Sequence, residues 1–180
     1  MKIRRVVAGV GLEGRATVLS DGIAPRHAEY QSLPGFALAL LWATPAEPVL
    51  DGCAVVDATP HAAFQPPAGG SCLMMVTFPP DSKMMRADFD PMAFGAEAVR
   101  LMPGLAETFE PEHPGFHTTD TIDYDVVLDG EITLELDDGR EVLLRHHDVA
   151  VQHGNRHAWR NKSDQPATML FVLIGARRAA

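Results

Sequence analysis

The chain has 180 residues, of which 46% are hydrophobic and 22% are charged, and its formal net charge at pH 7 is -9. This length and composition fit one globular domain, residues 1–180, with a sizeable core. The acidic balance argues against a nucleic-acid partner and against an anionic membrane surface, because both bind clustered Lys and Arg.

The first 71 residues predict N-terminal strands followed by a loop. Residues 4–10 and 15–22 predict two short strands joined by the turn Gly-Leu-Glu-Gly. Residues 35–44 are apolar and predict a buried strand, although a short apolar run is also compatible with a helix. The prolines and glycines of residues 44–71 predict a long loop.

One helix is predicted at residues 90–104. Asp90 suits the N-cap and Pro91 suits the first helical position, while the Pro-Gly pair at the other end is expected to terminate the helix. An apolar stripe at i, i+4 and i+7 is formed by Met92, Ala96 and Val99. This spacing predicts the face that packs on the core.

Strand patterns dominate the rest of the chain. They cover residues 71–78, 122–130, 131–139, 140–148, 149–154, 157–163 and 167–176. Asp138 and Gly139, between two alternating runs, predict a hairpin turn. Short strands at close spacing, with no helix between those beyond residue 115, predict an antiparallel barrel or sandwich.

Polar side chains recur at alternate positions where this region begins. His117, Thr119, Asp123 and Asp125 share one face if the stretch is extended, because side chains alternate along a strand. Polar groups inside a small barrel are costly unless they are satisfied by each other, by water or by a metal. Burial would raise the pKa of the Asp125 carboxyl, which could then serve as a proton donor.

Two stretches resemble the paired motifs of the cupin superfamily, whose small jelly-roll barrels hold a metal inside. The first motif, G-x5-H-x-H-x3,4-E-x6-G, is matched at His117, Asp123 (in place of Glu) and Gly130. The second motif, G-x5-P-x-G-x2-H-x3-N, is matched at Gly154, His157 and Asn161. The resemblance implies an all-β, cupin-type double-stranded β-helix with its barrel core at residues 72–175.

The chain departs from these motifs at further positions, among them residues 146–148 (His-His-Asp), which stand in place of the usual Gly-Asp turn. Thr119 stands at the second histidine, and Gln152 stands at the proline. The chain also resembles a cupin subgroup with the pattern H-x-T-D-T-x-D-Y…HAWRN, in which this threonine and aspartate are regular features. On that resemblance, the altered motif is a property of the subgroup and not a sign of decay.

The resemblance implies a divalent metal ion, Fe, Zn or Mn, bound by two histidines and one carboxylate. The implied ligands are His117, Asp123 and His157. Side chains expected to support the metal or to line the pocket are Thr119, Gln152 and Asn161. The alternative is a barrel interior held together by hydrogen bonds, without a metal.

Two classes of function follow. The first is a metal-dependent enzyme, of decarboxylase, lyase or dioxygenase type, that acts on a small organic acid or aromatic compound. The second is a non-catalytic barrel that binds a small ligand. The resemblance further implies a homodimer formed through the N-terminal strands, with residues 44–71 covering the barrel mouth or crossing to the partner.

The sequence also predicts a compartment. Its longest apolar runs are far shorter than the roughly 20 residues of a membrane span, and its N-terminus has no signal-peptide pattern. Cys53 and Cys72 form no CxxC motif and are too few for a disulfide framework. We therefore expect a cytoplasmic protein with reduced thiols.

Overall fold

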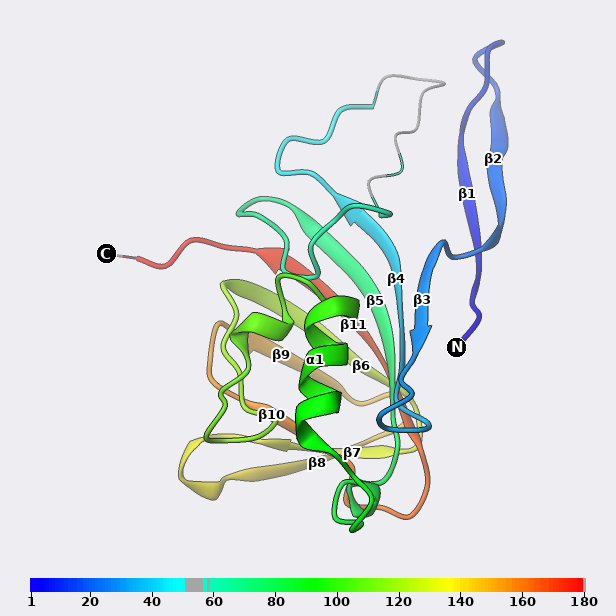
Figure 1. The fold of residues 1–180 in the computed structure, drawn as a ribbon. Helices are drawn as coiled ribbons and strands as arrows, with labels where there is room; N and C mark the ends of the chain where they lie inside the picture. Colours follow the sequence, from blue (N-terminus) through cyan, green and yellow to red (C-terminus); the bar gives the residue numbers. More distant parts are fainter. Residues whose placement is uncertain (51–56, 58, 180) are drawn as a thin grey trace.

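The computed structural model describes residues 1–50, 57 and 59–179 (Figure 1). Its strands are β1 (Arg4–Val10), β2 (Ala16–Ile23), β3 (Arg26–Glu29), β4 (Ala37–Thr44), β5 (Ser71–Phe78), β6 (Thr121–Asp129), β7 (Glu131–Glu135), β8 (Glu141–Arg145), β9 (Val149–His153), β10 (Ala158–Arg160) and β11 (Ala167–Gly175). The α-helix is α1 (Pro91–Leu101), and short 3₁₀ helices are Asp81–Lys83, Ala106–Thr108 and Asp137–Gly139.

The strands build a barrel from two sheets. A six-stranded antiparallel sheet has the order β3-β4-β5-β11-β6-β9, and a second sheet has the order β10-β7-β8 (Figure 1). Val127 from β6, Ile132 from β7 and Met169 from β11 are fully buried in one apolar cluster, so the core joins the two sheets. This arrangement confirms the predicted all-β jelly-roll fold.

Strand β6 carries Asp123 and Asp125 of the predicted polar stripe, whereas His117 and Thr119 precede the strand. Its side chains alternate strictly between buried and more exposed positions from Thr121 to Val127. The strand lies between β11 and β9, with Asp123 opposite Leu173 on one side and Gln152 on the other. Because both neighbours also turn one face inward, polar and apolar groups meet inside the barrel.

The helix begins as predicted but packs with a different face. The Asp90 carboxylate accepts hydrogen bonds from the backbone N–H groups of Met92 and Ala93, with Pro91 at the first helical position. The predicted core stripe is wrong, since Met92 is 81% and Val99 is 53% exposed. The residues that pack on the core are Phe94, Ala98 and Leu101.

The N-terminal strands form a separate hairpin. Strands β1 and β2 pair with each other as predicted, and the tip of the hairpin stands away from the barrel in Figure 1. Strand β3, which was not predicted, pairs with β4. The apolar run of residues 35–44 is therefore a strand and not a helix.

The predicted loop of residues 44–71 is only partly within the described residues, which exclude 51–56 and 58. Its described part returns to the barrel, where Phe64 is fully buried in the core. Cys72 is a buried free thiol, while Cys53 lies outside the described residues. In the portion of the chain that is described, no helix is long and apolar enough to cross a membrane.

Candidate metal centre

The structure brings His117 and His157 together. The two residues form an antiparallel bridge in which each backbone N–H donates to the other's carbonyl oxygen at 3.0 Å. Their ring centroids are 4.3 Å apart, and both side chains are buried. Two histidines 40 positions apart in the sequence thus lie side by side.

Backbone carbonyls fix the orientation of both rings. The Nδ1 atom of His117 lies 3.2 Å from the carbonyl oxygen of Gly115, and that of His157 lies 3.1 Å from the carbonyl oxygen of Asn155. A carbonyl oxygen can only accept, so in the neutral ring Nδ1 carries the hydrogen. Each Nε2 therefore keeps a free lone pair, which is the usual preparation of a metal-binding histidine.

Burial keeps these imidazoles uncharged. It lowers the pKa of His117 to about 4, with a further contribution from the charge that His157 would carry. Burial also lowers the pKa of His157. Neutral imidazole is the form that binds a metal ion, so the protonation state at neutral pH suits that role.

Two buried carboxyl groups, those of Asp123 and Asp125, lie on the inner face of β6. Asp123 is 5% and Asp125 is 1% exposed. Burial raises the pKa of Asp123 to about 6. Burial, and then the negative charge of Asp123, raise the pKa of Asp125 to about 8. In the described structure, Oδ1 of Asp123 and both carboxyl oxygens of Asp125 are buried without a hydrogen-bond partner.

The remaining predicted residues have different surroundings. The Thr121 hydroxyl donates to that of Thr119 at 2.7 Å, and both residues are buried. The Oε1 atom of Gln152 accepts from the side-chain amide of Asn155 at 2.8 Å, while its Nε2 has no partner among the described residues. Asn161 donates to the backbone carbonyls of Phe78 and Gln165, so it ties the turn before β11 to β5.

Comparisons with known proteins found relatives that match part of the chain. Phomopsin biosynthesis cluster protein C' of Diaporthe leptostromiformis is 52% identical over 62 residues, which cover 34% of this chain and 33% of that protein. Oryzines biosynthesis cluster protein J of Aspergillus oryzae is 43% identical over 83 residues, or 43% of this chain and 46% of that protein. No family model matches the chain.

A third relative carries a descriptive name. The cupin-domain-containing oxidoreductase fogC of Aspergillus ruber is 38% identical over 82 residues, which cover 44% of this chain and 37% of that protein. Over this stretch the chain is similar to a cupin-domain-containing oxidoreductase. Because the matches span less than half the length of each of these relatives, they assign no activity to this chain.

The structure presents part of a metal-binding set. The described ranges contain no group of three or more His, Cys, Asp or Glu side chains placed to hold a metal ion. The paired imidazoles with free Nε2 atoms nevertheless fit a borderline divalent cation. The unpaired Oδ1 of Asp123 is a buried acceptor on the same stripe. The residues thus fit a metal through two of the three predicted ligands, with the carboxylate apart from them.

A segment that sequence reasoning missed packs against the histidine pair. We call residues 109–117 the cover segment. The Phe109 ring stacks on the His117 ring, with centroids 4.4 Å apart and an interplanar angle of 22°. Glu110 forms a two-point ion pair with Arg156, which precedes His157. No short-range pattern signals this contact, because its partners are 46 positions apart.

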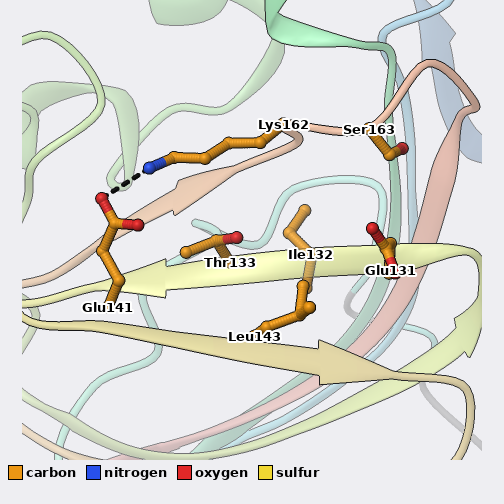
Figure 2. A pocket seen from close by; sticks show the side chains of 7 residues that line it. All are labelled: Glu131, Ile132, Thr133, Glu141, Leu143, Lys162 and Ser163. Atoms are coloured by element: carbon orange, nitrogen blue, oxygen red, sulfur yellow. Dashed lines mark hydrogen bonds and ion pairs between the residues drawn. The ribbon is translucent and has the colours of Figure 1, made fainter.

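An open depression lies elsewhere on the protein. Figure 2 shows it over β7 and β8, with Lys162 and Ser163 on its rim and an ion pair between Lys162 and Glu141 across it. None of the predicted site residues lines it. The depression is open to solvent and lies apart from the buried histidines and carboxyl groups described above.

Proposed function

We propose that this chain is a small metal-dependent cupin enzyme that acts on a small organic acid or aromatic metabolite. The observation that carries the proposal is the pair of buried, neutral imidazoles whose Nε2 atoms are free. His117 and His157 would hold the metal, with Asp123 as the third ligand. A bound divalent ion would supply a Lewis acid that polarises an oxygen of the substrate.

Asp125 is proposed as the proton donor. Its carboxyl is buried and lacks hydrogen-bond partners among the described residues, so a substrate oxygen or carbon could take its proton without competing contacts. Gln152 lies on the neighbouring strand β9, diagonally opposite Asp125. Its Nε2 has no partner among the described residues and could donate to a substrate oxygen. Together they would orient a small molecule on the floor of the barrel.

The reaction type is proposed at the level of class. Decarboxylation, lyase chemistry and ring-opening dioxygenation all polarise an oxygen-bearing substrate beside a proton donor. Relatives named cupin-domain-containing oxidoreductases, such as fogC of Aspergillus ruber, favour the oxidative branch. We propose a cytoplasmic location for the reaction, as the sequence predicted.

Metal content tests this proposal. Purified untagged protein would be dialysed against metal-free buffer and measured by inductively coupled plasma mass spectrometry, beside His157→Ala and the exposed control His147→Ala. We expect near one equivalent of metal in the wild type and the control, and little in His157→Ala. No metal in any of the three folded proteins would refute the proposal.

One observation favours the alternative of a non-catalytic ligand-binding barrel. The described structure has no complete group of three metal ligands. Its buried polar atoms without hydrogen-bond partners, on Asp123, Asp125 and Gln152, could equally bind a polar ligand. That function predicts that His117→Ala leaves ligand affinity unchanged. An enzyme of the proposed kind would lose turnover in the same variant.

We also propose that the protein is a homodimer. Val6, Val10, Val18 and Ile23 of the β1–β2 hairpin are 42% to 58% exposed, and neither strand pairs with another strand in the described chain. An isolated two-stranded hairpin is marginally stable in water. A second copy that covers this apolar surface would stabilise both hairpins.

A further inference from the structure

Two arginines flank His157 and hold the cover segment. Arg156 precedes the histidine, and Arg160 follows it by three residues. Both guanidinium groups lie over the ring of Phe116, at 3.8 Å for Arg156 and 5.4 Å for Arg160. Because Phe116 precedes His117, the two arginines beside His157 pack on the segment that carries His117.

Arg156 makes the stronger set of contacts. Its Nε and Nη2 donate to the two carboxylate oxygens of Glu110 at 2.6 and 2.7 Å, and its Nη1 donates to Asp137 at 2.8 Å. Hydrogen bonds from Arg156 hold the pKa of Glu110 below its usual range. A two-point guanidinium–carboxylate contact fixes orientation as well as distance.

Arg160 holds the other end of the cover segment. Its Nη1 donates to the carbonyl oxygen of Pro114 at 2.8 Å, while its Nε donates to Glu135 at 2.6 Å. Gly115 adopts φ +86°, and a Cβ at this position would lie 2.6 Å from Arg160 Nη1. The guanidinium therefore lies directly against the peptide of Gly115.

These contacts lie next to the backbone carbonyls that orient the two imidazole rings. The acceptor for His117 Nδ1 is the carbonyl of Gly115, and the acceptor for His157 Nδ1 is the carbonyl of Asn155. Arg160 packs on the first of these residues, and Arg156 directly follows the second. Movement of either arginine would release a carbonyl that sets the tautomer and the direction of a ring.

We propose that Arg156 and Arg160 are positioning residues that clamp the cover segment and thereby hold the Nε2 atoms of His117 and His157 in place for a metal ion. The inference rests on the proposed function for the metal itself. The clamp is defined by contacts within the chain and has consequences that do not require metal.

Cobalt(II) is a suitable probe, because its visible spectrum reports coordination and its titration gives an affinity. The variants are Arg156→Gln, Arg156→Lys and Arg160→Gln. The matched control is Arg4→Gln, which removes a two-point arginine–aspartate pair on the hairpin, far along the chain from the histidines. The charge swap Glu110→Arg/Arg156→Glu tests the pair directly.

We expect Arg156→Gln and Arg160→Gln to weaken Co(II) binding on the order of 10- to 100-fold, the usual effect of removing a residue that orients ligands. Arg156→Lys should have an intermediate Co(II) affinity, because lysine keeps the positive charge but cannot make the two-point contact with the carboxylate. The charge swap should recover part of the loss, and Arg4→Gln should match the wild type. Folded Arg156→Gln with wild-type affinity and spectrum would overturn the proposal.

A metal-free readout separates the clamp from the proposed function. Nitrogen-15 NMR of the histidine rings, assigned with His117→Ala and His157→Ala, should show the Nδ1–H tautomer at both rings in the wild type. Arg156→Lys or Arg156→Gln should shift at least one ring toward mixed tautomers. If the wild type binds no Co(II), the proposed function fails, and unchanged tautomers in the variants would then overturn the clamp as well.

Discussion

Asp123 and Asp125 lie two residues apart on the inner face of β6, and their surroundings separate their pKa values. Burial raises the pKa of Asp123 to about 6, whereas burial together with the charge of Asp123 raises the pKa of Asp125 to about 8. At neutral pH one carboxyl is mainly ionised and its neighbour holds a proton. Such a pair divides the roles of acceptor and donor in proton transfer.

The raised pKa of Asp125 predicts that stability falls as pH rises. Between its unfolded value of 3.8 and about 8, the folded chain binds a proton that the unfolded chain has released, so the free energy of unfolding decreases with pH. His117 acts in the opposite direction between about pH 4 and 6.5. Above pH 6.5, of these two groups only Asp125 changes the free energy of unfolding with pH.

Urea unfolding of metal-free protein at pH 6.5 and 7.5 would measure this effect. We expect the wild type to lose up to about 1.4 kcal/mol per pH unit from this one proton. Asp125→Asn removes the titrating group and should show a flatter pH dependence. Equal slopes in the two proteins would show that Asp125 is ionised in the folded state.

Loss of the proton donor should also slow turnover. Once a substrate is identified, Asp125→Asn should reduce kcat by about 10²-fold or more, because general acid catalysis contributes about 10²- to 10⁴-fold. The control Asp129→Asn changes an exposed carboxyl at the end of the same strand. Full turnover in Asp125→Asn would remove this residue from the mechanism.

Asn161 should matter for stability and not for metal binding. It is 1% exposed, donates to the carbonyls of Phe78 and Gln165, and accepts from the N–H and hydroxyl of Ser163. Asn161→Ala leaves these groups without their partner and should cost about 3 kcal/mol of stability. Chemical denaturation and Co(II) titration of the same sample would check both parts, and weakened Co(II) binding with unchanged stability would contradict them.

The exposed hairpin predicts the route of dimerisation. Val6 and Val18 lie on one face of the β1–β2 hairpin and are 51% and 58% exposed. Val6→Asp/Val18→Asp should convert a dimer into a monomer, because burying a charge in an apolar interface is unfavourable. Light scattering after size-exclusion chromatography measures the mass. A wild-type monomer, or a dimer that tolerates both aspartates, would contradict this interface.

Local chemistry allowed much of the fold to be predicted. The predicted turn at Asp138 and Gly139 has positive φ at both residues, 58° and 68°, as the sequence required. Gly130 closes the cupin motif because a Cβ there would lie 2.6 Å from the carbonyl oxygen of Pro166. The buried face of α1 could not be chosen, because Phe94, Ala98 and Leu101 repeat the same i, i+4, i+7 spacing two positions later.

The candidate site was predictable in part. Strand alternation placed Thr121, Asp123 and Asp125 on one buried face, as the structure shows. The pairing of His117 with His157 came from motif resemblance, since no local pattern joins residues 40 positions apart. The clamp through Glu110 and Arg156 could not be predicted, because it depends on where two loops meet after the barrel has closed.

The central claim is that His117 and His157 bind a divalent metal through their Nε2 atoms. Anomalous diffraction from a crystal of the protein grown with Zn(II), recorded at the zinc edge, tests it most directly. We predict one anomalous peak about 2.0–2.1 Å from both Nε2 atoms. No peak beside this pair, in a crystal whose zinc binds only elsewhere, would contradict the account.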